Sequence, residues 1–201
     1  IRGRIYRDMR SSGLVAESYQ KAWDLGAHKP SNAKNLGSSY FQSGQYQKAV
    51  TYLRKLEGKD RTSLSLWTLG QSYKQLQQKD SALYFMQRAR AYMMPDFRIY
   101  KDLVMDMADT YLNMREYDKA IGLYKDLAAN DVIIPPAYRP NVQAGAYISI
   151  GDMYDRQLND AKKALKWYQK AHAIEKPYDP ERQEYVRKKV KRLKEQVFME
   201  E

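Results

Sequence analysis

Few residues of this 201-residue chain are of types that could carry out chemistry. The two histidines, His28 and His172, are far apart in the sequence. Each lies beside the end of an expected helix, where histidine usually meets the helix dipole or solvent. The chain has no cysteine, which excludes disulfides, thiolate zinc sites and cysteine nucleophiles. It also has no phosphate-binding glycine-rich loop, nucleophile elbow or HExxH sequence. We therefore expect no enzyme activity, no metal site and no cofactor.

The composition is that of a folded chain with an excess of positive charge. Hydrophobic residues make up 43% and aromatic residues 12%, which is enough for a core and excludes extensive disorder. Lys and Arg number 35 against 24 Asp and Glu, a formal net charge of +11. No apolar run is long enough to predict a transmembrane span. The absence of cysteine is compatible with a periplasmic or other extracytoplasmic location as well as with the cytoplasm.

A pattern of small and aromatic residues recurs along the chain. A Gly or Ala is followed by Tyr three residues later and by a small residue nine residues after that Tyr, or ten in the copy that begins at Gly151. A large apolar or aromatic residue comes four residues later, and a small or apolar one three beyond it. Small residues let two helices approach closely, and apolar residues spaced by three and four share one helical face. The copies are Gly37-Tyr40-Ala49-Leu53-Leu56, Gly70-Tyr73-Ala82-Met86-Ala89, Ala108-Tyr111-Ala120-Tyr124-Leu127, Gly151-Tyr154-Ala164-Tyr168-Ala171, and a degenerate Gly3-Tyr6-Val15-Tyr19-Ala22.

This pattern resembles the tetratricopeptide repeat family, whose 34-residue unit forms two antiparallel helices. Trp67 and the Leu-Gly pairs at 36–37 and 69–70 strengthen the match, which covers roughly residues 1–175. The resemblance implies an all-α fold, a right-handed superhelical solenoid of antiparallel helix pairs. With five copies and one further helix, we expect about eleven helices.

The spacing of the copies predicts the domain organisation. A tetratricopeptide array spans 1–177, with a partial repeat at 1–29 and repeats at about 30–62, 63–96, 97–134 and 137–177. The larger spacing between Tyr73 and Tyr111 predicts a longer helix that begins near Asp96. Three prolines in 131–140 preclude a regular helix there. This segment is either a binding loop or a connection whose isoleucines dock under their own repeat, and its role stays open.

Residues 178–201 are predicted to form a C-terminal capping helix. Asp179 is suited to the N-cap position, with Pro180 and Glu181 in the first turn. An apolar stripe on one face of this helix can cover the last repeat, while Lys and Arg occupy the solvent-exposed faces, as a terminal capping helix requires. The stripe consists of Tyr185, Val186, Val190, Leu193 and Val197. The N-terminus has no such cap, and the chain starts at Ile1 rather than Met, so we interpret it as a fragment that lacks natural sequence upstream.

In this family the first helices of the repeats line a concave groove, and the resemblance places a partner-binding face on this sequence. The expected groove residues are Arg4, Arg7, Lys34, Ser38, Gln71, Lys74, Asp102, Met105, Asp109, Asp152 and Asp155, with Ile148 beside them. This groove is expected to be basic toward the N-terminal end and acidic toward the C-terminal end. The acidic part suits a basic or amphipathic segment of a partner.

Two other interpretations of the same residues stay open. The family's best-known ligand mode holds a C-terminal carboxylate with Lys, Asn and Arg side chains; only Lys34 and the displaced Asn35 match it, so we do not expect it here. The groove face could also be solvated without any ligand. The methionines between residues 86 and 114 are interpreted as core rather than as an adaptable binding surface.

The sequence favours a non-catalytic protein–protein interaction scaffold that binds a peptide or protein segment, as part of a larger protein or complex. One alternative is nucleic-acid or anionic-surface binding through the basic ends, since 1–10 hold four Arg and one Asp, and 181–196 hold seven basic and three acidic residues. That alternative is disfavoured because a capping helix needs a charged outer face in any case. The other alternative is a self-assembly module, a homo-oligomer in which the uncapped N-terminal helix pair stacks on a second copy.

Overall fold

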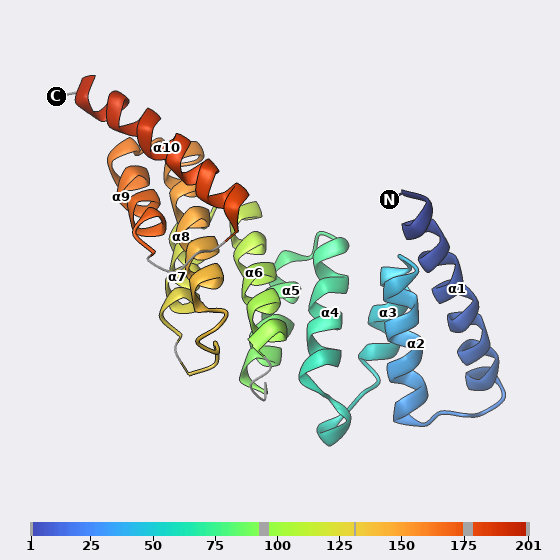
Figure 1. The fold of residues 1–201 in the computed structure, drawn as a ribbon. Coiled ribbons are helices and arrows are strands. Elements are labelled where there is room, and N and C mark those ends of the chain that lie inside the picture. Colours follow the sequence, from blue (N-terminus) through green and yellow to red (C-terminus); the bar gives the residue numbers. More distant parts are fainter. Residues whose placement is uncertain (1, 93–96, 131, 175–178, 200–201) are drawn as a thin grey trace. The chain divides into compact units, whose positions relative to one another are not determined.

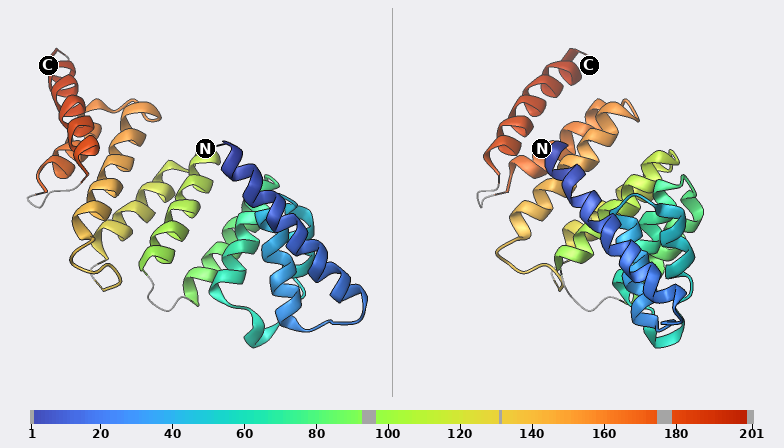
Figure 2. Two further views of the ribbon diagram at one scale, coloured as in Figure 1. Left: turned by 45° about the vertical axis from the view of Figure 1, so that its right-hand side comes forward. Right: turned by 90° about the vertical axis from the view of Figure 1, so that its right-hand side faces the viewer.

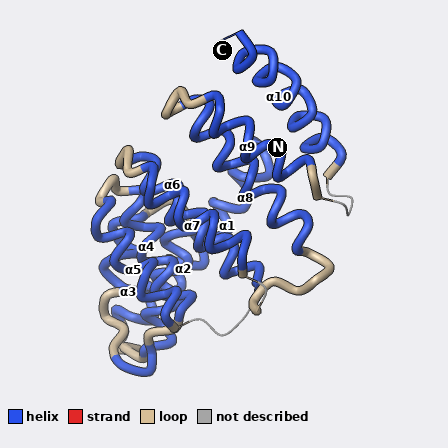
Figure 3. Tube along the Cα trace, turned by 90° about the vertical axis from the view of Figure 1, so that its left-hand side faces the viewer, coloured by secondary structure: helices blue, strands red, loops and turns tan. Residues whose placement is uncertain are grey.

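The predicted all-α class is confirmed by the computed structural model, which describes residues 2–92, 97–130, 132–174 and 179–199 and places side chains for them, apart from 2–10 and 59. Over these ranges the chain forms ten α-helices, one 3-10 turn at Gly58–Asp60 and no β-strand (Figures 1 and 3). The helices are α1 (Arg2–Asp24), α2 (Pro30–Gln42), α3 (Tyr46–Leu53), α4 (Ser63–Gln75), α5 (Lys79–Ala91), α6 (Phe97–Asn113), α7 (Tyr117–Ala129), α8 (Arg139–Arg156), α9 (Ala161–His172) and α10 (Pro180–Met199).

The chain divides into two units, residues 1–94 and 95–201, and each is described by itself. In the N-terminal unit, α1 packs against α2, α2 against α3, α3 against α4 and α4 against α5. In the C-terminal unit, α6 to α10 do the same (Figure 2). The helix bounds fall inside the predicted repeat ranges, while the repeat boundaries themselves stay a prediction.

The prediction of a helix pair in residues 1–29 is wrong. The described residues therefore form ten helices where about eleven were expected. Residues 2–24 form one continuous helix, α1, without a turn near Gly13. No proline interrupts this stretch, and α1 packs along α2 over its second half. Ala16 is fully buried there, and the Gln20 amide oxygen accepts hydrogen bonds from the hydroxyls of Tyr40 and Tyr52 at 2.9 and 2.6 Å. These contacts hold a continuous helix where the degenerate repeat pattern had indicated a turn.

Each full repeat reverses direction at a residue with a left-handed backbone. Each of these residues follows the Tyr of its repeat pattern by four or five residues. Their φ values are 78° at Gly44, 60° at Gln77, 60° at Arg115 and 49° at Asn159. Glycine adopts this region at little cost, whereas the three other residues bear some steric strain. The turns are therefore held by the packing of the helices on either side.

The small residues of the pattern lie where paired helices touch. A Cβ atom added to Gly70 would lie 2.7 Å from the Met86 side chain, and one added to Gly151 would lie 3.0 Å from the Tyr168 ring. Both distances are shorter than carbon–carbon contact, so only glycine fits without rearrangement. The interpretation of these glycines as points of close helix approach is confirmed.

The predicted apolar stripe of the last helix faces the preceding repeat. Val186 and Leu193 are fully buried and Val190 is 9% exposed, and all three join the core formed by α9 residues such as Tyr168. The Asp179 carboxylate accepts a hydrogen bond from the Arg182 backbone N–H at 2.9 Å, which is the predicted N-cap interaction. The sequence evidently encodes both the start of α10 and its buried face.

The two extended spacings in the sequence have different structural outcomes. Helix α6 has 17 residues where α2 and α4 have 13 each, so the four extra residues lengthen it, as predicted. In the 131–140 segment, Ile134 is 2% exposed, and its carbonyl oxygen accepts a hydrogen bond from Arg139 at 3.1 Å. Pro140 lies in the first turn of α8. The described part of this segment thus buries Ile134 and is bound through its carbonyl oxygen by Arg139 of α8.

Candidate functional site

The described groove residues all lie on the first helices of their repeats. Lys34 and Ser38 are on α2, Gln71 and Lys74 on α4, Asp102, Met105 and Asp109 on α6, and Asp152 and Asp155 on α8. Arg4 and Arg7 belong to α1, but their side chains lie outside the described residues. Because these positions are shared between two units, each unit is considered by itself, and in the C-terminal unit several of them line cavities.

A cavity of about 490 Å³ lies between α6 and α8, at the N-terminal end of α10. Its walls are mostly apolar and include Met105 from α6 and Ile148 from α8, both placed in the groove by the sequence. Met105 is 42% exposed, in contrast to the buried Met86 and Met107. The full lining is Phe97, Lys101, Met105, Tyr124, Leu127, Tyr138, Asn141, Val142, Gly145, Ala146, Ile148, Ser149, Asp179 and Arg182.

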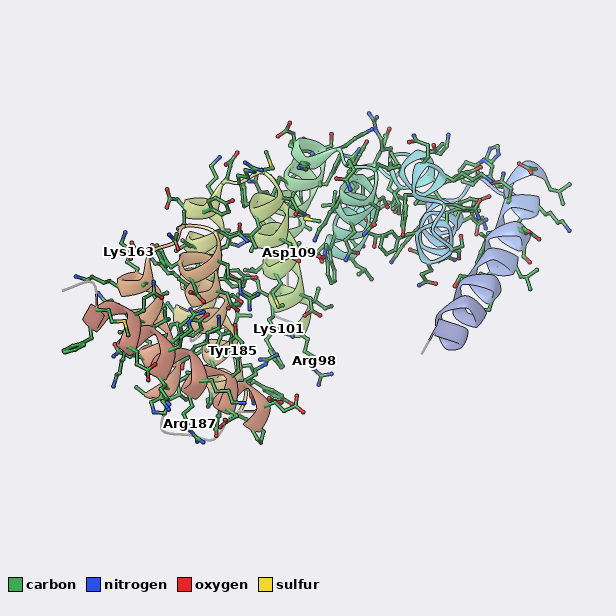
Figure 4. The ribbon with its side chains drawn as sticks, turned by 90° about the horizontal axis from the view of Figure 1, so that it is seen from above. Arg98, Lys101, Asp109, Lys163, Tyr185 and Arg187 are labelled. Atoms are coloured by element: carbon green, nitrogen blue, oxygen red, sulfur yellow. The ribbon has the colours of Figure 1, made fainter. Side chains whose placement is uncertain are left out.

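Two cations border this cavity. Lys101 lies on the first turns of α6 and forms an ion pair with Asp102 at 3.1 Å, although both side chains stay substantially exposed. A Cβ atom added to Gly145 would lie 3.3 Å from a terminal nitrogen of Arg182, so the Arg182 guanidinium lies over α8 at the point where that helix has no side chain. Figure 4 shows Lys101 and Arg98 on the same end of α6, with Asp109 further along that helix.

The remaining polar groups at the cavity are engaged with one another. The Asn141 side-chain oxygen accepts a hydrogen bond from the backbone N–H of Asp179 at 3.1 Å, and Asp179 in turn caps α10. The carboxylate of Asp179 is therefore oriented by the helix start, whereas Lys101 and Arg182 are the charged groups that a ligand could meet. The cavity combines an apolar interior with a charged border, on which Lys101 and Arg182 lie close to the carboxylates of Asp102 and Asp179.

The expectation of an acidic C-terminal groove needs correction at Asp152 and Asp155. Asp155 is paired with Lys189 at 2.6 Å and with Arg192, both on α10, and its side chain is 10% exposed. One oxygen of Asp152 accepts hydrogen bonds from the Tyr168 hydroxyl at 2.7 Å and the Tyr185 hydroxyl at 2.5 Å. Both carboxylates are thus taken up by contacts that attach α10, because the capping helix covers this part of α8.

The electrostatics of this attachment follow from burial and hydrogen bonding. Burial raises the pKa of the Asp155 carboxyl, but hydrogen bonds from Lys189 and Arg192 more than offset burial and leave that pKa below its ordinary value. Burial also raises the pKa of the Tyr168 hydroxyl, and its hydrogen bond to Asp152 raises it further. Tyr168 therefore stays protonated and donates to Asp152 at any physiological pH.

A second cavity of about 560 Å³ contains Asp109 of the predicted groove set. It lies between α6, α7 and α8, and Arg115, Arg156 and Asp152 are among its lining residues. The two arginines balance the two carboxylates around it, so this cavity has no excess of negative charge. Asp102 and Asp109 are the predicted groove carboxylates that α10 leaves exposed.

Several residues at the first cavity were missed by the sequence. Phe97 and Tyr138, whose ring centroids are 4.5 Å apart, come from the lengthened α6 and from the residue before α8. Arg182 was interpreted as part of the solvated face of the capping helix. All three lie on insertions or outside the repeats, where the repeat pattern does not predict which residues face the groove. Only the extra residues in the spacing could have drawn attention to them.

Both histidines are exposed. The His28 ring lies 4.5 Å from the Trp23 ring, and His172 is exposed at the end of α9. Over the described ranges, no group of three or more His, Cys, Asp or Glu side chains could hold a metal ion.

Comparison with known proteins identifies the repeats. Models of the tetratricopeptide repeat match residues 35–58 and 105–180. The chain is a tetratricopeptide repeat protein. The comparison with curated protein sequences found no significant match. In the described residues of this tetratricopeptide repeat protein, no helix is long and apolar enough to span a membrane.

Solved structures share the fold. MamA is 24% identical, with a TM-score of 0.61 over 78% of this chain and 84% of MamA. YrrB, described as a TPR protein with an unusual peptide-binding site, is 20% identical, with a TM-score of 0.62 over 89% of this chain and 84% of YrrB. The apo form of RapI is 14% identical, with a TM-score of 0.69 over 96% of this chain and 58% of RapI. At these identities the likeness shows a common repeat fold.

Proposed function

We propose that this tetratricopeptide repeat protein is a non-catalytic interaction module whose C-terminal unit binds a segment of a protein partner. The observation that carries the proposal is the cavity of about 490 Å³ between α6 and α8, with Met105 exposed in an otherwise apolar wall. Burying such a surface against a partner releases water from apolar area and is favourable. YrrB, which has the same fold, is itself a peptide-binding protein, and this supports the proposal.

The occupant we propose is an amphipathic segment with one or two large apolar side chains and a nearby carboxylate. The apolar side chains would enter the cavity, and the carboxylate would meet Lys101 and Arg182 at its border. This proposal keeps the amphipathic character of the earlier expectation and replaces its basic character with a carboxylate. The basic character rested on four aspartates, and α10 occupies two of them.

Selection from a library of displayed random peptides tests this proposal. The wild-type protein should enrich peptides that combine large apolar residues with Asp or Glu. Met105→Lys places a charge in the apolar wall and should abolish the enrichment. Leu64→Lys is the matched control, because Leu64 is 49% exposed on α4 of the other unit and should leave enrichment intact. Equal enrichment by the Met105→Lys variant, or none by the wild type, would reject the cavity as the binding site.

Binding of nucleic acid through the basic C-terminal end is a weaker candidate in this fold. Of the seven cations on α10, Arg187 and Lys188 pair with Glu184, while Lys189 and Arg192 pair with Asp155. Internal partners reduce the charge that could displace counterions from a phosphate backbone. A steep loss of RNA affinity with added salt would favour this function over peptide binding.

Self-assembly is favoured by one observation on α1. Leu14 and Val15 are 59% and 46% exposed, and these two neighbouring residues place apolar surface on α1. A second copy could cover this patch. Light scattering over a range of protein concentrations tests this, and Leu14→Lys should shift any dimer toward the monomer. A monomer at all concentrations would rule out assembly through this patch.

A further inference from the structure

The N-terminal unit contains a separate cavity bordered by three arginines. It has a volume of about 230 Å³ and lies between the end of α3, the connection that follows it, α4 and α5. Leu53, Leu66 and Leu69 contribute its apolar floor, and Phe85 closes one side. Arg54, Arg61, Arg88, Ser65 and Tyr84 supply its polar lining.

The three arginines that line the cavity come from three different places in the chain. Arg54 is the residue that ends α3, and its side chain is exposed. Arg61 follows the 3-10 turn, and its Nε donates a hydrogen bond to the Leu56 carbonyl oxygen at 2.6 Å, which leaves its two terminal nitrogens available. Arg88 comes from the last turn of α5.

Arg88 is held in place by its own helix. One terminal nitrogen donates a hydrogen bond to the Tyr84 hydroxyl at 3.0 Å, and the guanidinium lies 5.6 Å from the centroid of the Tyr84 ring. Hydrogen bonds from Arg88 to Tyr84 and Tyr92 raise the pKa of this guanidinium, so it is always charged. The Tyr84 hydroxyl, which accepts from Arg88, keeps its own proton to donate to a ligand.

The part of this cavity's lining that the structure describes contains three cations and no carboxylate. Among the described residues none of the lining side chains is acidic, and none of the three arginines takes part in an ion pair. This differs from the C-terminal unit, where the cations of α10 are paired with Glu184 and Asp155. Three guanidiniums around one small cavity repel each other unless an anion lies between them.

We propose that this cavity binds a phosphomonoester dianion. A phosphoryl group has three terminal oxygens and up to two negative charges, so each arginine can donate to one oxygen, and Tyr84 can add a fourth donor. A single carboxylate would leave most of the positive charge unbalanced. The apolar floor suits the carbon atoms to which such a phosphate is attached. The site lies in the N-terminal unit and is independent of the peptide cavity proposed above.

Titration of the full chain with inorganic phosphate tests the proposal directly. Sodium chloride keeps the ionic strength constant, and backbone amide shifts report the location of binding. We expect saturable shifts of amides at Arg54, Arg61 and Ser65. Arg54→Gln and Arg88→Gln should each weaken phosphate binding by about tenfold or more, since each removes a charge-assisted hydrogen bond. Arg61→Lys keeps the charge but loses the planar fork, and it should also weaken binding.

A matched control separates a site from general attraction to a basic protein. Arg187→Gln removes the same charge from an arginine on α10 and should leave the phosphate affinity unchanged. O-phosphoserine then distinguishes a phosphorylated side chain from a free anion, by binding more tightly than phosphate in the first case and equally in the second. Non-saturable shifts, or equal weakening by Arg187→Gln and Arg88→Gln, would overturn the proposal. Because the Arg54 side chain is exposed, Arg54→Gln should keep the fold, which a thermal melt verifies.

Discussion

The same repeat position is used for packing in one unit and for attachment in the other. In the N-terminal unit, Gly70 on α4 meets Met86 of α5, an aliphatic side chain that only fills space. In the C-terminal unit, Gly151 on α8 contacts Tyr168 of α9, and the Tyr168 hydroxyl donates a hydrogen bond to Asp152. Tyr185 of α10 donates to that same carboxylate. The repeat pattern requires only a large apolar or aromatic residue at the position of Met86 and Tyr168. In the last repeat, the Tyr168 hydroxyl at this position also helps to attach the capping helix.

Charge differs between the units in a related way. In the C-terminal unit the carboxylates of α8 and the cations of α10 neutralise each other at the contact between these helices. In the N-terminal unit three arginines surround a cavity without a carboxylate. Arg187, labelled in Figure 4, lies on α10 and forms an ion pair with Glu184 of the same helix at 3.0 Å. Total charge alone could not distinguish internally paired cations from cations that remain available to a ligand.

The largest effect is expected from the apolar part of the α10 attachment. Leu193→Ala removes a fully buried side chain and should lower the free energy of unfolding of the C-terminal unit by about 3 kcal/mol. Hydrogen exchange should show α10 amides losing protection while α2 to α5 keep theirs. Phe198→Ala, at a residue 82% exposed on the same helix, is the control and should change little. Unchanged α10 protection in Leu193→Ala would contradict the packing described.

The polar part of the attachment should contribute somewhat less. Asp152→Ala leaves the Tyr168 and Tyr185 hydroxyls without their acceptor and should cost about 2 kcal/mol. Tyr185→Phe removes one of the two hydroxyl donors to Asp152, together with the acceptor of one Arg156 hydrogen bond, and should cost about 1 kcal/mol. Both values can be measured by chemical denaturation followed by near-UV circular dichroism. If Asp152→Ala cost no more than Tyr185→Phe, then the carboxylate would not link the two tyrosines.

Two glycines should respond in opposite directions to the same substitution. Gly70→Ala gains about 1 kcal/mol of helix propensity, but its Cβ would press against Met86 and the Ala82 carbonyl oxygen, for a net loss of about 1 kcal/mol. Gly122→Ala, on α7 with no atom within 4 Å of the added Cβ, should gain about 1 kcal/mol. Thermal melting compares them. Stabilisation by both substitutions would mean that close helix approach does not require glycine at residue 70.

The smallest effect concerns pH. The pKa of Asp155 is lower in the folded protein than in the unfolded chain, so its ion pairs stabilise fully above the unfolded value, near 4, and lose this effect as the pH falls through the lower folded value. The contribution is on the order of 0.5–1 kcal/mol, since Arg192 is half exposed. The stability difference between wild type and Asp155→Asn should therefore shrink between pH 5 and about pH 2. A difference that is constant over this range would show that Asp155 is not paired as described.

The sequence predicted the elements better than it predicted the site. Spacing of Gly, Tyr and Ala predicts the helix pairs because each small residue marks a contact between two helices, and Asp179 marks the start of α10 because only a few side chains can cap a helix. The degenerate first copy was misleading, since a shared spacing does not by itself impose a turn. Asp152 and Asp155 were assigned to an open groove because the repeat pattern does not say what α10 covers.

The cavity residues were harder to predict for the same reason. Met105 and Ile148 follow from their place on first helices, whereas Lys101, Tyr138 and Arg182 come together only once the longer α6, the 131–140 segment and α10 are folded. The repeat pattern does not include the residues of an insertion or of a capping helix, so it cannot predict a cavity that they border. Its chemistry becomes visible only in three dimensions.

Amide shift mapping with a selected peptide tests the central claim most directly. A peptide enriched by the wild-type protein is titrated into the labelled full chain, and the shifted backbone amides are assigned. We predict that the largest shifts cluster at Lys101, Met105, Gly145 and Ile148, around the cavity between α6 and α8. Shifts confined to the N-terminal unit, or to the basic outer side of α9 and α10, would contradict the proposed site.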